Sequence, residues 1–245
     1  MWKRPIVVRK NGTIEVVASV NQWGTVAKTL GGDNVNVTSI INSTNVDAHD
    51  YEPTTSDIAK LQKAQVIIVN GAGYDAWAVK AAQSANATIV NAAAVGGVND
   101  GENPHVWFSA DVRKAVAQAI TEAYEQADAA KKSDFDKLHD QWKSEENNVE
   151  SKIAEVKQKS DGLAYAATES VASYLAEDMG LTDATPSGYA RATANESEPT
   201  PTDIKQFTDA LKAGEIKLLV VNTQEESELT GKITNAAKSA KRANG

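Results

Sequence analysis

Three histidines supply all the imidazole chemistry of this chain, and two of them lie in short polar motifs. His49 lies in Asp47-Ala48-His49-Asp50-Tyr51-Glu52-Pro53, which also holds three carboxylates and an aromatic ring. His105 lies in Asn103-Pro104-His105-Val106-Trp107, where the proline holds the residue before it in an extended shape. A neutral imidazole is a common metal ligand, and nearby carboxylates favour a cation and orient the ring. Each motif therefore contains a candidate metal ligand, with an ordinary polar loop as the alternative.

One glutamate joins these histidines as a candidate ligand. Glu169 follows an apolar run, Leu163 to Ala167, and is expected to be the first residue of a helix capped by Thr168. A helix-start charge is one interpretation of this carboxylate, and a ligand at the end of a strand is the other. Two imidazoles and a carboxylate are a common set for divalent transition metals. The remaining histidine, His139, lies inside a helical pattern and is expected to be an ordinary helix position.

Alternating strand and helix patterns would position these residues. In the first half, β-branched runs predict strands over 14–19, 35–41, 66–69 and 88–90. Helical patterns predict helices over 22–30, 56–63 and 74–85. This order implies parallel strands with helices on both faces of the sheet. Ligands of such sheets bind beyond the carboxyl ends of the strands, which is where the His49 loop is expected.

A long helix and a second strand–helix unit follow. Ser109 is expected to cap a helix to about Asp128, and apolar residues from Phe135 to Val156 then recur at helical spacing over ~26 residues, or ~39 Å. Strands over 163–167 and 217–221 and helices over 169–180, 203–213 and 225–241 complete the second unit. The sequence predicts an α/β fold: two Rossmann-like lobes with parallel sheets, residues 1–132 and 161–245, joined by one long helix, residues 133–160.

Composition excludes several classes of protein. The chain has 245 residues, 41% hydrophobic and 24% charged, which is enough for two small domains. Its net charge of −8 and pI of about 5.0 argue against a nucleic-acid binder, which normally presents a basic face. No apolar run is long enough to span a bilayer, and the first residues lack the apolar core of a secretion signal. Cysteine is absent, which excludes disulfides and thiolate metal sites.

A nucleotide-binding loop is a further interpretation of the turn at Asn70-Gly71-Ala72-Gly73. Glycine-rich turns between a strand and a helix bind phosphates through their backbone N–H groups. Here the third glycine of the dinucleotide fingerprint is missing, and Asp75 lies where a phosphate would be repelled. The sequence therefore disfavours a dinucleotide site.

Taken together, the motifs resemble those of a known family, the zinc and manganese solute-binding lipoproteins of ABC importers, also called cluster A-I. The resemblance runs from about Gly12 to the end of the sequence, and its most specific part is the pair of motifs around His49 and His105. The other matching residues are Val16-Val17-Ala18-Ser19, Trp23, Asp57, Leu61, Asn70-Gly71, Trp77, Tyr174, Gly180-Leu181 and Glu198-Pro199-Thr200-Pro201.

The resemblance implies that His49 and His105 of the first lobe and Glu169 of the second are metal ligands. Zinc-type members often have histidine at the third position and a histidine-rich loop before the Asn-Pro-His motif. Here the third residue is Glu169, and residues 91–102 contain no histidine. Both differences favour manganese, with zinc and ferrous iron as alternatives.

Family members continue with a further strand, a loop carrying an acidic fourth ligand, and a terminal helix. This sequence ends at Gly245, so we expect it to lack those segments. Water, Asp47 or Asp50 would then complete the coordination, and the metal would be held less tightly than in a complete member.

The implied function is that of an extracytoplasmic, monomeric solute-binding protein. It would capture a divalent transition metal between its lobes and deliver it to the membrane permease of an ABC importer, without catalysing a reaction. We expect no nucleic-acid partner, and membrane attachment only through a lipid anchor that, like the signal, is not in this sequence. Two alternatives are a metalloenzyme, whose two histidines and one carboxylate would leave a coordination position open for substrate, and a surface adhesin of the same fold.

Overall fold

The chain forms two compact units, Met1–Glu150 (unit 1) and Ser151–Gly245 (unit 2). The computed structural model describes residues 12–43, 46, 51–224 and 227–243, with only the backbone described for 241–243. The division between the units falls inside a single helix, α6 (Lys132–Ser160). The lobe and linker bounds expected from the sequence, with the long helix separate from both lobes, remain a prediction.

Unit 1 is built on a parallel sheet with the strand order β2-β1-β3-β4. The strands are β1 (Ile14–Val20), β2 (Val35–Ile41), β3 (Val66–Val69) and β4 (Thr88–Asn91). All four residues of β3 are buried, as expected for a central parallel strand covered on both faces. The predicted parallel arrangement is therefore confirmed.

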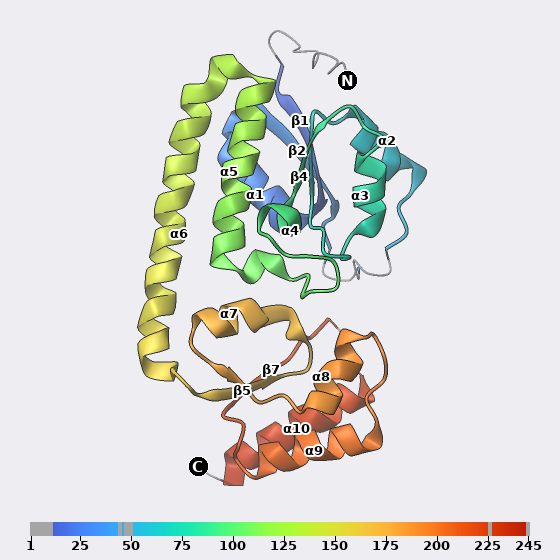
Figure 1. Ribbon diagram of the computed structural model, residues 1–245, viewed down its shortest axis with the longest axis vertical. Helices are drawn as coiled ribbons and strands as arrows, with labels where there is room; N and C mark the ends of the chain where they lie inside the picture. The colour runs from blue at the N-terminus through green and yellow to red at the C-terminus, as the bar shows by residue number, and fades with distance from the viewer. Residues whose placement is uncertain (1–11, 44–45, 47–50, 225–226, 244–245) are drawn as a thin grey trace. The chain divides into compact units, whose positions relative to one another are not determined.

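Helices cover both faces of this sheet (Figure 1). On one face lie α1 (Asn21–Gly31) and α5 (Ala110–Ala127), and on the other lie α2 (Thr55–Lys63) and α3 (Ala76–Ala82). Val17, Ile67 and Val69 form a buried core with apolar residues of α2 and α3. On the opposite face, Tyr124 of α5 donates a hydrogen bond to the carbonyl oxygen of Ala27 on α1 at 3.0 Å. The alternation of strands and helices thus gives a layered α/β unit.

The long helix α6 begins at Lys132 and ends at Ser160, which confirms the predicted long helix. It follows the short 3-10 turn η3 (Ala129–Lys131) and runs beside α5 (Figure 1). Phe135 and Trp142 are buried, and the Phe135 ring lies 5.4 Å from that of Tyr124. Val149 and Val156 were expected on the same apolar side, but they are 47% and 43% exposed. The apolar side of α6 is therefore buried only over the first part of the helix.

Unit 2 contains a smaller parallel sheet with the strand order β6-β5-β7. The strands are β5 (Ala164–Ala167), β6 (Thr182–Asp183) and β7 (Leu218–Val220), and the helices are α7 (Ser173–Asp178), α8 (Ser187–Ala194), α9 (Pro201–Lys212) and α10 (Glu228–Ala243). Ala166 packs into a core with residues of α8, α9 and α10, whereas Tyr165 and Ala167 pack with Ala176 of α7. Alternate residues of β5 thus face opposite layers, as a strand requires.

Some local details differ from the sequence-based expectations. The short elements α4 (Ala92–Val95), β6 and α8 were not predicted, because elements of two to eight residues carry little periodic signal. Thr54 caps α2, where the sequence suggests Thr55 or Ser56, and Thr200 caps α9, where it suggests Thr202. In both cases an aspartate three residues after the cap accepts a hydrogen bond from the cap N–H and completes a capping box.

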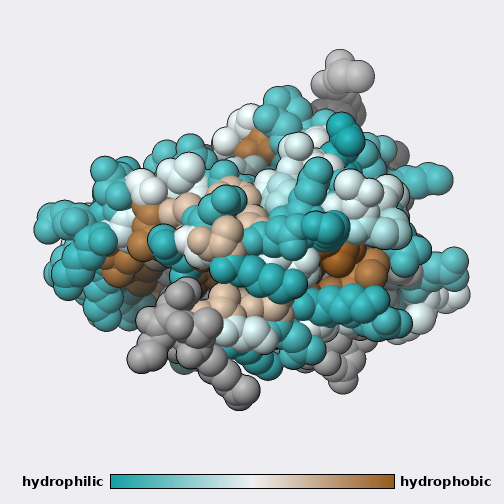
Figure 2. All heavy atoms as spheres, turned by 90° about the horizontal axis from the view of Figure 1, so that it is seen from below, coloured by the Kyte–Doolittle hydropathy of each residue, from teal (hydrophilic) through white to brown (hydrophobic). Residues whose placement is uncertain are grey.

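The molecular surface is mainly hydrophilic on the face that Figure 2 shows, where hydrophobic residues lie in small separate groups. Such scattered apolar residues are normal on a protein surface. Within the described part of the chain, no helix is both long enough and apolar enough to cross a membrane.

Candidate metal site

His105 lies in unit 1, at the centre of a tight turn between β4 and α5. Its backbone angles are φ −78° and ψ 46°, and the Pro104 carbonyl oxygen accepts a hydrogen bond from the Val106 N–H at 2.8 Å. This is the geometry of an inverse γ-turn. The 3-10 turn η2 (Val106–Phe108) follows directly and leads to Ser109, which caps α5 as expected. The histidine lies at the centre of this turn and is only 6% exposed.

The side chain of Asn103 determines which ring nitrogen of His105 carries the hydrogen. Asn103 Oδ1 accepts a hydrogen bond from the backbone N–H of His105 at 3.1 Å, which identifies that atom as the oxygen. The ring Nδ1 of His105 lies 2.7 Å from the same oxygen. Since an amide oxygen can only accept, Nδ1 must donate, and in the neutral ring the lone pair then resides on Nε2. A metal-ligating histidine commonly has this arrangement, with its second nitrogen donating to a fixed acceptor.

A buried amide holds the other end of the His105 turn. Asn70, fully buried at the end of β3, donates from Nδ2 to the Pro104 carbonyl oxygen at 2.9 Å. Its Oδ1 accepts from the indole N–H of Trp23, also at 2.9 Å. The following residue, Gly71, has φ +79°, and a Cβ there would approach the Asn91 side-chain oxygen to 2.2 Å. The Asn-Gly pair thus combines a side-chain clamp with a backbone conformation that only glycine fits easily.

Asp75 occupies the backbone groups that a phosphate would need at the same turn. Its carboxylate accepts hydrogen bonds from the N–H groups of Asn70 at 2.7 Å and Gly71 at 2.9 Å. Burial raises the pKa of Asp75 above its ordinary value, although the hydrogen bonds from the backbone N–H groups of Asn70 and Gly71 act in the opposite direction. The turn is therefore already filled by a carboxylate from this chain, which agrees with the sequence argument against a dinucleotide site.

His49 lies outside the described residues, as do Asp47 and Asp50. The described part of its motif begins at Tyr51, whose hydroxyl donates to Asp57 Oδ2 at 2.7 Å and whose ring lies 5.1 Å from that of Trp77. Burial and the Asp57 carboxylate raise the pKa of Tyr51 to about 12, so the phenol remains a donor. The chain is thereby anchored two residues after His49.

Glu169 lies in unit 2 directly after β5, but it is not the first residue of a helix as the sequence suggested. Its backbone is extended, with φ −155° and ψ 151°; the 3-10 turn η4 (Ser170–Ala172) follows, and α7 begins only at Ser173. The Thr168 hydroxyl accepts from the Asn222 N–H at 3.0 Å instead of capping a helix. The side-chain amide of Asn222 donates to Glu169 Oε2. The carboxylate is thus held by a residue just after β7.

Asn222 is a residue that sequence reasoning missed. It is the first polar side chain after the apolar run that contains β7, just as Glu169 follows the run that contains β5. Parallel neighbours end at the same edge of a sheet, and β5 pairs directly with β7. The position of Asn222 after a strand that neighbours β5 was the available signal. An isolated asparagine is too common in loops for the sequence alone to identify Asn222 as the partner of Glu169.

The structure describes two of the three expected ligands, one in each unit. His105 has its hydrogen-bond partner in unit 1, and Glu169 has its partner in unit 2. Within either unit taken alone, the described residues hold no group of three His, Cys, Asp or Glu side chains that could bind a metal. A site with the expected ligand set therefore needs His49 and residues of both units.

A separate cavity of about 660 Å³ lies on the outer helices of unit 2, where Ile204 and Lys205 of α9 face Leu229 and Lys232 of α10. Both lysines form ion pairs with carboxylates of their own helix, Lys205 with Asp209 and Lys232 with Glu228. The cavity is not lined by Glu169. It is therefore distinct from the residues considered for a metal.

Comparison with known proteins identifies the family of this chain. Residues 16–244 match the profile of the family described as ZnuA, zinc-uptake complex component A, periplasmic. A metal ABC transporter substrate-binding lipoprotein of Lactococcus lactis subsp. lactis is 26% identical over 234 residues, which cover 87% of this chain and 72% of the relative. The manganese ABC transporter substrate-binding lipoprotein PsaA of Streptococcus anginosus is 24% identical over 231 residues, covering 86% of this chain and 72% of that protein.

The fold is likewise found among solved structures. Zn(II)-bound AdcA from Streptococcus pneumoniae superimposes with a TM-score of 0.73 at 20% identity, covering 93% of this chain and 50% of AdcA. The chain thus spans half the length of that protein, and the likeness concerns the fold. The family profile extends over almost the whole sequence. The chain therefore belongs to the ZnuA family, the metal-binding components of ABC transporters.

Proposed function

We propose that this protein captures a divalent transition metal with His49, His105 and Glu169 and delivers it to the permease of an ABC importer. The observation that carries the proposal is the pairing of His105 with Asn103, which leaves the lone pair on Nε2. In the neutral ring, this hydrogen bond selects the tautomer whose Nε2 can bind a metal.

The family supports the transport role over the enzymatic alternative. Its members are substrate-binding proteins of ABC transporters and not enzymes. The relatives are lipoproteins or periplasmic proteins by name, which supports a site of action outside the cytoplasm. We propose that the protein acts there as a monomer. A lipid anchor is the proposed membrane attachment.

Manganese is the metal that we propose, with zinc and ferrous iron as alternatives. The carboxylate of Glu169 is a hard oxygen donor, which manganese and ferrous iron prefer over an all-histidine site. The relatives themselves differ, since one is named for manganese and another structure holds Zn(II). Elemental analysis of the purified protein, followed by competitive titration with Mn²⁺ and Zn²⁺, identifies the metal. A Glu169→His variant is expected to shift the preference from manganese toward zinc.

Substitution of the ligands tests the site itself. We expect His49→Ala, His105→Ala and Glu169→Ala each to weaken metal binding by at least about tenfold, and the two histidine variants by far more. The matched control is His139→Ala, because this third histidine lies on α6 beside Trp142, with ring centroids 6.3 Å apart. Equal losses in all four variants would place the metal elsewhere.

A further inference from the structure

One buried ion pair connects the turn that carries His105 to the long helix α6. Arg113, in the first turn of α5, donates from Nη1 to the carbonyl oxygen of Trp107 at 3.1 Å. The same guanidinium donates from Nε, at 2.9 Å, and from Nη2 to Oε1 of Glu146 on α6. The two side chains are only 16% and 8% exposed. A single arginine therefore bonds to two segments that are distant in sequence.

The planar guanidinium makes this connection rigid. Its donors have a fixed mutual geometry, unlike the single rotatable ammonium of a lysine. Because the planar guanidinium of Arg113 donates to both the Trp107 carbonyl and Glu146, a shift of either acceptor strains the hydrogen bond to the other. Trp107 is two residues after His105 and lies in the 3-10 turn η2, for which His105 is the N-cap. Asn70 holds the preceding side of this turn at Pro104, so Arg113 supplies the clamp on its following side.

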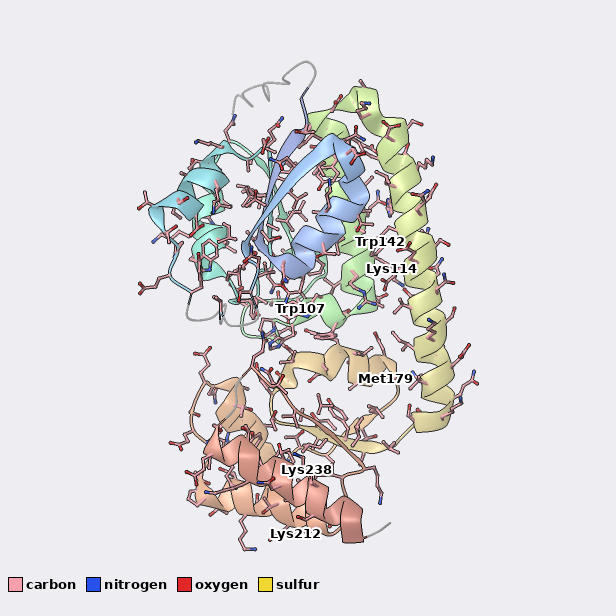
Figure 3. All side chains as sticks on the ribbon, turned by 180° about the vertical axis from the view of Figure 1, so that it is seen from behind. Trp107, Lys114, Trp142, Met179, Lys212 and Lys238 are labelled. Atoms are coloured by element: carbon pink, nitrogen blue, oxygen red, sulfur yellow. The ribbon has the colours of Figure 1, made fainter. Side chains whose placement is uncertain are left out.

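A neighbouring ion pair joins the same two helices without this role. Lys114 of α5 pairs with Glu150 of α6 at 2.8 Å, and also with Asp111 of α5 at 3.5 Å. It is more open to solvent, at 38% and 32% exposed. Figure 3 labels Lys114 on α5, Trp142 on α6, and Trp107 just before the start of α5. The two pairs differ in that Arg113 also bonds the turn of His105, which makes Lys114 and Glu150 a matched control.

We propose that Arg113 is a positioning residue for His105, and that through Glu146 it makes the position of the metal-ligand turn depend on α6. Because α6 runs from unit 1 into unit 2, the Arg113–Glu146 pair links the His105 turn to the helix that joins the units. The consequence for metal affinity rests on the proposed function. The coupling of the turn to α6 is a property of the metal-free chain and is tested separately.

The main test replaces the pair by apolar side chains of similar length, in the double variant Arg113→Met/Glu146→Met. A single Arg113→Met change would leave Glu146 buried and unpaired and could unfold the chain, whereas replacing both partners commonly preserves stability. Amide hydrogen exchange in the metal-free protein reports on the turn at Val106, Phe108 and Ser109, whose N–H groups bond within it. We expect faster exchange at these amides than in the parent and a Zn²⁺ affinity about tenfold weaker, with the urea midpoint of unit 1 little changed.

Two further variants keep the outcome interpretable. Arg113→Lys retains the charge but not the planar fork, so it should reproduce the faster exchange of the turn. Lys114→Met/Glu150→Met should leave both exchange at the turn and Zn²⁺ affinity as in the parent. Parent-like exchange in the Arg113→Met/Glu146→Met protein, or an equal effect of the control pair, would overturn the proposal. If the parent itself binds neither Mn²⁺ nor Zn²⁺, the proposed function fails, while the exchange data still decide whether Arg113 holds the turn.

Discussion

At the scale of single residues, the chemistry of His105 depends on a neutral amide two positions earlier. Asn103 accepts from both the backbone and the ring of this histidine, so it orients the imidazole without adding charge to the site. An outer partner of this kind typically contributes tenfold to a hundredfold to metal affinity.

The first prediction concerns that partner. Asn103→Ala is expected to weaken Zn²⁺ binding about tenfold to a hundredfold, since the ring then lacks its fixed acceptor. Asn103→Asp keeps an oxygen at the same position and should retain most of the affinity. Competitive titration against a chelator measures both variants. Similar affinities for the alanine variant and the parent would show that the hydrogen bond does not matter for binding.

The ionisation of Asp57 depends strongly on the side chains around it. Burial by itself raises the pKa of Asp57, but hydrogen bonds from Thr54, Tyr51 and Lys60 outweigh burial and hold the pKa well below its ordinary value. The ionised form therefore stabilises the folded state. This contribution is fully present above the unfolded pKa, about 3.9, and is lost as the pH falls toward the folded pKa.

The second prediction follows from the direction of this pH dependence of stability. Asp57→Asn should lower the stability of unit 1 at pH 7 by about 1 kcal/mol, the usual net contribution of a hydrogen bond, because the charged acceptor is lost. Urea unfolding followed at a series of pH values should show the difference from the parent shrinking below about pH 4. A difference that stayed constant down to pH 2 would mean that the charge of Asp57 contributes nothing.

At the scale of elements, the ends of helices are set by short reciprocal motifs. Thr200 caps α9, and its hydroxyl accepts from the Asp203 N–H at 3.3 Å, while the Asp203 carboxylate accepts from the Thr200 N–H at 2.9 Å. Pro201 is the first residue of the helix, where its missing N–H costs nothing. The buried side chains of α9, Ile204, Phe207 and Leu211, then face the core of unit 2.

The third prediction tests this helix start. Thr200→Ala should destabilise unit 2 by about 1 kcal/mol, whereas Thr200→Ser should cost much less because serine is an equally good cap. Amide hydrogen exchange in the first turn of α9 locates the effect. If the serine variant lost as much stability as the alanine variant, the methyl group rather than the cap would be responsible.

At the scale of the whole molecule, a shared metal would connect the stability of the two units. A ligand that binds only the folded state stabilises it by about 2.7 kcal/mol at a concentration one hundred times its Kd. With ligands from both units, as proposed, neither unit can unfold without releasing the metal.

The fourth prediction is that saturating Mn²⁺ or Zn²⁺ raises the unfolding midpoints of both units in the parent. In the Glu169→Ala variant, the metal should stabilise unit 1 far more than unit 2, because the ligand contributed by unit 2 is gone. Hydrogen exchange of β3 and β5 amides reports on the two units separately. Equal stabilisation of both units in the variant would argue against Glu169 as a ligand.

Much of the fold could be predicted because the signals are local. Continuous apolar runs such as Val66–Val69 identify buried parallel strands, and the spacing of Phe135, Leu138 and Trp142 identifies the long helix. Both patterns depend on burial within a few residues of the chain. The prediction of a helix starting at Glu169 was wrong, because the residue that holds Glu169, Asn222, lies 53 residues further along the chain.

The sequence by itself determined the alternation of strands and helices, the family, and the candidate ligands His49, His105 and Glu169. The tertiary structure alone decided which partners hold two of them. Asn70 reaches Pro104 across 34 residues, Arg113 reaches Glu146 across 33, and Asn222 reaches Glu169 across 53. Hydrogen bonds of this kind form only after packing has brought distant segments together, so no pattern of neighbouring residues encodes them.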